Sequence, residues 1–232
     1  MKKRMYLLIF IMSFALGGCS GLEMVESTGR AQSPILIIDP GHGGEDGGAV
    51  AGDGSKESEI NLAVSLKIEE LCGFLGLNSV MTRTSEKLDY PETADTIRKK
   101  KVADQKARIE LINSMPNAVL ISVHQNMYPS KSPAGAQALY SKNQGSKELA
   151  ELLQDNFSTY LTSDNKRSAA QISGDIYLMK KAECTAVLVE CGFISNPNEL
   201  ALLKDAEYQK KIASVIMSSY TQFISETGNF YG

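Results

Sequence analysis

Short apolar runs that alternate with longer segments of helical period constrain this chain more than any other feature. The runs are ILIID, AVLIS and AVLVE, beginning at residues 35, 118 and 186, and each has the length of a buried strand. Between and after them, apolar residues recur at helical spacing over residues 57–75, 99–113, 146–161 and 206–224. Strands separated by helices predict an α/β fold: a single domain with a mostly parallel, twisted sheet of about six strands and helices on both faces.

Three weaker patterns complete the expected sheet. Residues 78–83 (NSVMTR) predict a strand, residues 135–140 (GAQALY) alternate as an edge strand does, and residues 175–179 (DIYLM) predict a short strand. In the helix expected over 99–113, the periodicity places Val102 among the inward-facing residues.

The N-terminus has the layout of an export signal. Three basic residues precede an apolar run over residues 5–16, which is shorter than the roughly 20 residues of a membrane span. The run ends in LGGC, which resembles a bacterial lipobox, in which Cys19 becomes the lipidated first residue. An uncleaved membrane anchor and plain secretion are the alternatives.

These features divide the chain into three parts. We expect a signal sequence of lipoprotein type over residues 1–19, a polar tether over 20–33 and a folded domain over 34–226. Each alternative for the N-terminus exports the domain. A lipid or an uncleaved anchor would hold it on the outer side of the cytoplasmic membrane.

Charge and cysteine usage exclude some functions. The chain has 24 Lys+Arg against 27 Asp+Glu, a formal net charge of -3, so no nucleic-acid partner is expected.

If Cys19 carries lipid, Cys72, Cys184 and Cys191 remain. The last two flank one predicted strand and would lie about 20 Å apart, too far for a disulfide. We therefore expect three buried, unpaired thiols.

Both histidines of the chain follow predicted buried strands. His42 lies just after ILIID, His124 just after VLISV, and Glu190 ends AVLVE. The carboxyl ends of parallel strands meet at one edge of a sheet, where ligands bind. Two imidazoles and a carboxylate suit a catalytic Zn²⁺ ion with water in the remaining position. The pattern predicts a metal-assisted hydrolase with one zinc ion per chain.

The residues alone leave the carboxylate ligand open. Spacing does not choose among the acidic residues near His42, which are Glu45, Asp46, Asp53, Glu57 and Glu59. Glu57 begins the first long helix, where the helix dipole favours a negative charge. Glu190 is expected on the opposite side of the metal, where a general base could take a proton from water.

The glycine-rich loop PGHGGEDGG has two interpretations. Its glycines allow the backbone to approach a metal and substrate closely, and they permit positive φ angles. The alternative is a phosphate-binding loop. That alternative is disfavoured because the loop lacks both Gly-Lys-Ser/Thr and a GxGxxG that opens a helix.

Seven motifs together resemble one family. The chain contains, in this order, IDPGHGGEDGGA, KESEINLA, MTR, ARIELIN, LISVHQN, GAQALY and LVECGFISNPNE. Over about residues 34–225 it is similar to the zinc-dependent N-acetylmuramoyl-L-alanine amidases (amidase_3) of bacterial cell walls. The resemblance implies a zinc exopeptidase-like fold, zinc ligands His42, Glu57 and His124, and the catalytic carboxylate Glu190. The implied reaction is hydrolysis of the amide between N-acetylmuramic acid and L-alanine in peptidoglycan.

The resemblance extends to a subgroup and departs from the family at one position. Ser58 replaces a basic residue of the family motif beside the ligand Glu57. The segment over 84–106, the YLMKKA stretch and the N-terminal segment are similar to spore-cortex, germination-specific members. This similarity implies action in the spore cortex, on the route to muramic-δ-lactam, from the space between the two forespore membranes.

A regulatory protein partner is also expected. Ordering loop residues costs about 1–2 kcal/mol per residue, so a glycine-rich metal site gains zinc affinity when a partner orders it.

Two other classes fit part of the pattern. A catalytically silent peptidoglycan-binding lipoprotein would be expected to lack a ligand or Glu190, and neither is lost. A zinc carboxypeptidase on a related fold would release amino acids without separating glycan from stem peptide.

Arg83 and Arg108 are expected to form structural ion pairs, with a substrate carboxylate as the alternative partner. Asn126 is expected to orient His124 or to contact substrate.

Overall fold

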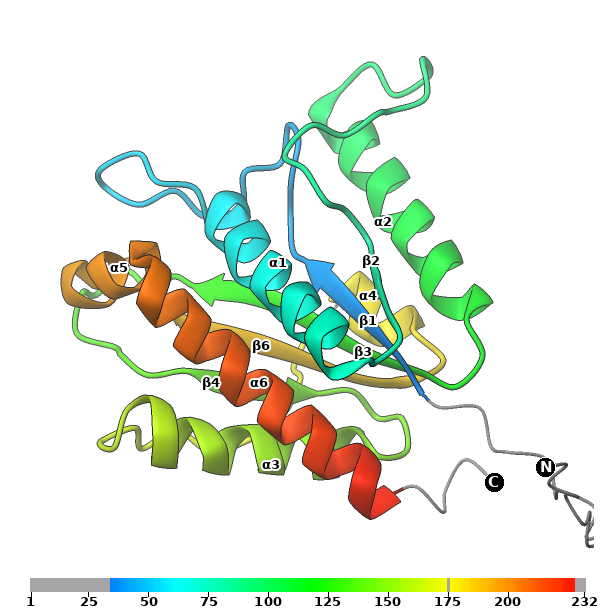
Figure 1. Ribbon diagram of the computed structural model, residues 1–232. Coiled ribbons are helices and arrows are strands. Elements are labelled where there is room, and N and C mark those ends of the chain that lie inside the picture. The colour runs from blue at the N-terminus through cyan, green and yellow to red at the C-terminus, as the bar shows by residue number, and fades with distance from the viewer. Residues whose placement is uncertain (1–33, 175, 228–232) are drawn as a thin grey trace, which may run out of the picture. The chain divides into compact units, whose positions relative to one another are not determined.

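A six-stranded sheet forms the centre of the domain in the computed structural model, which describes residues 34–174 and 176–227 (Figure 1). The expected signal sequence, the tether and Cys19 lie outside these residues. The strand order is β2-β1-β3-β6-β4-β5. The strands are β1 (Ile35–Pro40), β2 (Ser79–Met81), β3 (Ala118–Asn126), β4 (Gln137–Tyr140), β5 (Ala170–Gln171) and β6 (Thr185–Phe193).

Most of the sheet is parallel. β1 pairs in parallel with β2 and β3, and β3 pairs in parallel with β6. β4 runs antiparallel to β6, and the short β5 is parallel to β4. These pairings confirm the predicted single α/β domain with a mostly parallel sheet of six strands.

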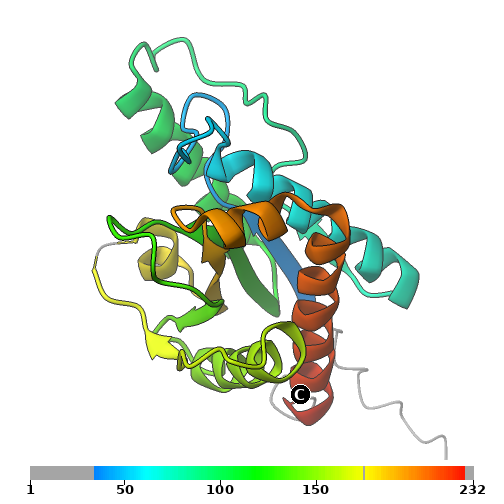
Figure 2. The ribbon, with the colours of Figure 1, turned by 90° about the vertical axis from the view of Figure 1, so that its left-hand side faces the viewer.

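Helices cover both faces of the sheet (Figure 2). α1, α3 and α6 pack over one face and bury a core cluster that includes Ile68, Leu149 and Tyr220. α2 and α4 cover the other face through a smaller cluster that includes Ile112 and Leu178. The helices are α1 (Glu57–Leu75), α2 (Ile97–Ser114), α3 (Ser146–Asn156), the π-helix η1 (Phe157–Leu161), α4 (Tyr177–Lys181), α5 (Pro197–Lys204) and α6 (Ala206–Thr227).

The predictions for residues 175–179 and for Val102 are wrong. The expected strand over 175–179 is instead part of α4 from Tyr177 onward, where the consecutive residues Leu178 and Met179 are both buried against the sheet. A strand would send these two side chains to opposite faces. Val102 is 45% exposed rather than inward-facing. Arg108 and Ile112 are the buried residues of α2, so its first turns cover no core.

The segment GAQALY does not form the edge of the sheet. The structure places β5 outside β4, with Leu139 paired to Ala170. β5 has two residues, which is too short for a period-two pattern to reveal.

The cysteines agree in part with the expectation of three buried, unpaired thiols. Cys72, Cys184 and Cys191 are unpaired, as predicted; Cys72 and Cys191 are buried, and Cys184 is partly buried. Among the described residues, no helix has the length and apolar character needed to cross a membrane.

Candidate metal centre

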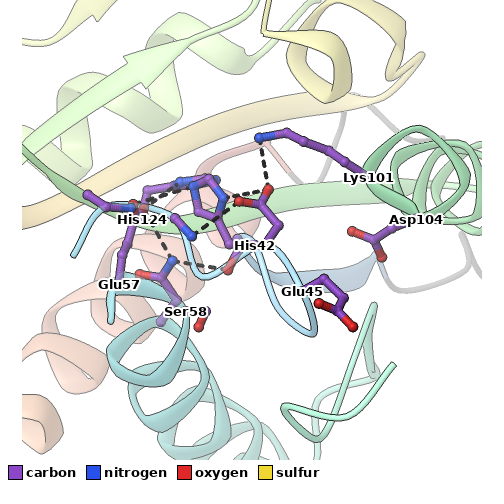
Figure 3. A network of polar contacts seen from close by, with 12 residues as sticks. His42, Glu45, Glu57, Ser58, Lys101, Asp104 and His124 are labelled. Atoms are coloured by element: carbon purple, nitrogen blue, oxygen red, sulfur yellow. Dashed lines mark hydrogen bonds and ion pairs between the residues drawn. The ribbon is translucent and has the colours of Figure 1, made fainter. Parts of the chain in front are cut away.

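Three side chains from separate elements converge at the carboxyl edge of the sheet (Figure 3). His42 lies in the loop after β1, Glu57 is the first residue of α1, and His124 lies near the end of β3. One ligand atom from each lies within 4.8 Å of the others. The two imidazole rings meet edge to face, with centroids 5.0 Å apart. This His42–Glu57–His124 cluster is the candidate metal centre.

Glu57 is the carboxylate that the structure brings to the two histidines. Its Oε1 lies 2.9 Å from His124 Nδ1, and its Oε2 lies 3.4 Å from His42 Nε2. The backbone N–H groups of Ala49 and Gln125 donate to the same carboxylate. Burial opposes ionisation of Glu57, but the hydrogen bonds with the histidines hold its pKa well below its usual value.

The other acidic candidates have different places. Asp53 pairs with Lys204 at 2.8 Å, Glu45 pairs with Lys100 at 3.0 Å, and Glu59 is exposed. Asp46 does reach the cluster, but it contacts His42 from the side away from Glu57.

Asp46 orients His42. Its Oδ2 lies 3.0 Å from His42 Nδ1, and Lys101 forms an ion pair with the same oxygen at 2.8 Å. Burial disfavours the imidazolium, but the hydrogen bonds with Asp46 and Glu57 raise the pKa of metal-free His42 to about 9. A second carboxylate on the far nitrogen of a metal-binding histidine fixes its ring orientation. The sequence analysis missed this role, although the four-residue spacing from His42 to Asp46 was a usable signal.

The glycines are required by close packing around the cluster. A Cβ atom on Gly41 would lie 2.3 Å from His124 Nε2. Gly48 has a φ of +68°, and a Cβ atom there would lie 2.6 Å from Glu57 Oε2. His42 itself has a φ of 61°, a strained conformation that is concentrated at functional sites. The loop therefore wraps tightly around the cluster, as the close-approach interpretation predicted.

Two further residues, which the sequence did not single out, hold the loop and Glu57 in place through hydrogen bonds. Asn61 Nδ2 donates to the Gly41 carbonyl at 3.1 Å and contacts Glu57 Oε1 at 3.4 Å. Gln125 Nε2 donates to Asn61 Oδ1 at 3.1 Å. Asn61, rather than Asn126, is thus the asparagine bonded to the cluster within the described part of the chain.

Glu190 faces the same region from β6. It is paired with His124 in the parallel register of β3 and β6. Its Oε2 is buried and has no hydrogen-bond partner among the described residues. Burial raises the pKa of Glu190 to about 7. A buried carboxylate with an unused oxygen is a candidate proton carrier.

A cleft of about 360 Å³ joins these groups. His42, His124 and Glu190 line it from the sheet edge, Gln105 from α2 and Tyr177 from α4. The cleft gives a substrate access to the cluster and to Glu190 together.

Arg83 and Arg108 hold the loop backbone, which confirms their predicted structural role. Arg83 donates to the carbonyls of Pro40, Gly41 and Ser58. Arg108 donates to the carbonyls of Pro40 and His42 and forms an ion pair with buried Asp39 at 2.7 Å.

The fold and the cluster define an α/β protein with a candidate metal centre at the carboxyl edge of its sheet. Residues 36–222 match the family model Amidase_3, described as N-acetylmuramoyl-L-alanine amidase. The chain belongs to this family, whose members hydrolyse the bond between N-acetylmuramic acid and L-alanine.

Individual relatives support the assignment to this family. The germination-specific N-acetylmuramoyl-L-alanine amidase of Bacillus subtilis is 36% identical over 84% of this chain and 81% of its own length. The CwlD amidase of Clostridioides difficile, solved in complex with the GerS lipoprotein, superposes with a TM-score of 0.79 at 36% identity, over 83% of this chain and 98% of that chain. The catalytic domain of CwlV from Bacillus (Paenibacillus) polymyxa var. colistinus gives a TM-score of 0.68 at 25% identity, again over 83% and 98%.

Proposed function

We propose that this chain is a zinc-dependent N-acetylmuramoyl-L-alanine amidase, with His42, Glu57 and His124 as zinc ligands and Glu190 as the catalytic carboxylate. The observation that carries the proposal is the convergence of these three ligands opposite Glu190. Two imidazole nitrogens and one carboxylate oxygen form a ligand set typical of catalytic zinc, which leaves a position for water. The donor set therefore fits the ion that the family uses.

Glu190 moves the proton in the proposed reaction. When bound, zinc supplies the positive charge that polarises the scissile carbonyl and makes a water molecule acidic. Glu190 takes a proton from the attacking water as the new C–O bond forms at the lactyl carbonyl carbon. It then gives that proton to the nitrogen of L-alanine as the C–N bond breaks. The products are a free lactyl carboxylate on the glycan and a stem peptide with a free amino group.

Chelation should reversibly stop cleavage of purified peptidoglycan. Removing the metal leaves Glu190 without an acidified water, so stem peptides that begin with L-alanine should disappear from the products and return when zinc is added. Mass spectrometry of the digest measures this. Release of single amino acids would favour a carboxypeptidase, and binding of peptidoglycan without new ends would favour a silent binding module.

Replacing Asp46 with alanine should weaken zinc binding about 10- to 100-fold, because the carboxylate that orients His42 is lost. Titration of the metal-free chain with zinc in the presence of a competing chelator measures the dissociation constant. Asp53→Ala is a matched control, since Asp53 pairs with Lys204 on the surface. Equal zinc affinity of Asp46→Ala and the control would show that Asp46 does not support the ligand.

We further propose action in the spore cortex, on the route to muramic-δ-lactam. The similarity to the germination-specific amidase of Bacillus subtilis supports this setting. Cortex that retains its muramic-δ-lactam after deletion of the gene would contradict it.

The domain is proposed to be exported and held on the outer side of the cytoplasmic membrane, in a spore-former between the two forespore membranes. A lipid on Cys19 is the proposed anchor. A mature N-terminal peptide of unmodified mass would contradict lipidation.

A regulatory protein partner that orders the zinc site remains part of the proposal. Supporting it, the similar CwlD amidase was solved in complex with the GerS lipoprotein. Equal zinc content in the isolated chain and in its cellular complexes would count against this role.

A further inference from the structure

Arg167 stands apart from the other basic side chains around the candidate metal centre. Three of those side chains have carboxylate partners: Lys101 with Asp46 at 2.8 Å, Arg83 with Glu86 at 2.9 Å and Arg108 with Asp39 at 2.7 Å. Arg167 has no carboxylate within ion-pair distance over residues 34–174 and 176–227. A cation near a catalytic centre without an internal partner is available to a substrate anion.

The guanidinium of Arg167 is held in one orientation. Its central carbon lies 4.4 Å from the centroid of the Phe193 ring. Its Nε donates to the Ala134 carbonyl at 3.0 Å, and its Nη1 donates to Gln137 Oε1 at 2.9 Å. These bonds use two of the five N–H donors of a guanidinium. The remaining donors belong to a planar group that is already fixed, so little entropy is lost when they bind a ligand.

Arg167 lies beside the proposed catalytic carboxylate. Gln137, which accepts its hydrogen bond, is paired with Glu190 in the antiparallel register of β4 and β6. Directly opposed residues in such a pair project to the same face of the sheet. The Gln137 side chain therefore links Arg167 to the face of the sheet that carries Glu190.

Only one part of the substrate near the scissile bond carries a negative charge. The sugars bear hydroxyl and N-acetyl groups, and the lactyl carboxyl is consumed in the scissile amide. The stem peptide continues from L-alanine to a glutamate that is linked through its γ-carboxyl, which leaves the α-carboxylate free or amidated. A stacked, planar guanidinium presents parallel N–H groups that match a carboxylate.

We propose that Arg167 binds the free α-carboxylate of the acidic residue that follows L-alanine in the stem peptide. The inference rests on the proposed function, because that function supplies the substrate. Arg167 is then a specificity residue: it selects stems with a free carboxylate over amidated ones, and it takes no part in proton transfer.

The test compares two glycan-tripeptide substrates that differ only at the α-carboxyl of the second residue, one free and one amidated. The zinc-loaded full chain, purified in detergent, should cleave the free form with a kcat/KM about tenfold higher. Arg167→Gln should raise KM for the free form about tenfold, leave kcat nearly unchanged, and leave the amidated form unaffected, so that the preference disappears. Arg167→Lys should restore part of the preference, since charge remains without the planar fork.

Two controls separate recognition from structure. Lys166→Gln removes the exposed neighbouring charge and should keep the preference. Equal loss on both substrates in Arg167→Gln, or a retained preference, would overturn the inference. If the wild type cleaves neither substrate, the proposed function fails. Calorimetric binding of the two free stem peptides to the wild type and Arg167→Gln then decides the role of Arg167 separately.

Discussion

Replacing Glu190 with glutamine should lower kcat about 10²- to 10⁴-fold while the chain keeps its zinc. Glu190 Oε2 is buried and has no partner among the described residues, so the change of oxygen to amide leaves no broken ion pair in this part of the chain. What is lost is the ability to accept a proton from water and return it to the leaving amine. Cleavage of purified peptidoglycan and metal content, measured on the same preparation, separate these effects.

A matched control sharpens the Glu190 result. Glu183→Gln removes an exposed carboxylate just before the start of β6, at the opposite end of the strand, and should leave both activity and zinc content unchanged. Loss of zinc together with activity in Glu190→Gln would make Glu190 a ligand. Full activity would remove it from the mechanism.

Replacing Arg108 with methionine should destabilise the domain by about 3–5 kcal/mol, because it leaves a buried carboxylate without its partner. Asp39 is 0% exposed and Arg108 is 4% exposed, and their 2.7 Å ion pair lies under the loop that carries His42. Urea denaturation of the metal-free protein measures the free energy of unfolding. Arg98→Met, an exposed change on the same helix, should alter it by about 0.5 kcal/mol or less. A similar small effect for Arg108→Met would refute the structural role of the pair.

The same ion pair predicts that the free energy of unfolding falls at acid pH. Burial opposes ionisation of Asp39, but the charge of Arg108 and hydrogen bonds from Ser122 and Thr82 hold its pKa below the usual value of 3.8. Since the folded pKa is lowered, this stability is present above the unfolded pKa and is lost as the pH falls below it. The wild type should therefore lose more stability than Arg108→Met on going from neutral pH to below pH 4. Parallel curves would contradict the linkage.

The central strands could be predicted because they are continuous apolar runs, and the long helices because apolar residues recur in them at helical spacing. β1, β3 and β6 are apolar runs whose ends place His42, His124 and Glu190 at one edge. The prediction fails for elements too short to show either pattern. α4 is a single helical turn that buries two consecutive residues, and β5 is a two-residue strand.

The two histidines of the candidate site could be predicted from the sequence pattern, but the carboxylate beside them could not. Five acidic residues lie near His42 in the sequence, and only the path of the glycine loop determines that Glu57 reaches both imidazoles while Asp46 lies behind His42. The family resemblance selected Glu57 where spacing did not. The positions of Asn61 and Arg167 depend on contacts between segments far apart in the chain, which no local pattern encodes.

The most direct test of the proposed centre is anomalous scattering at the zinc absorption edge from crystals of the zinc-loaded protein. The proposal predicts one peak per chain, with atoms of His42, Glu57 and His124 at about 2.0–2.2 Å and Glu190 facing it without bonding to it. A zinc peak elsewhere in the molecule, or none after loading, would contradict the assignment of these residues as the metal centre.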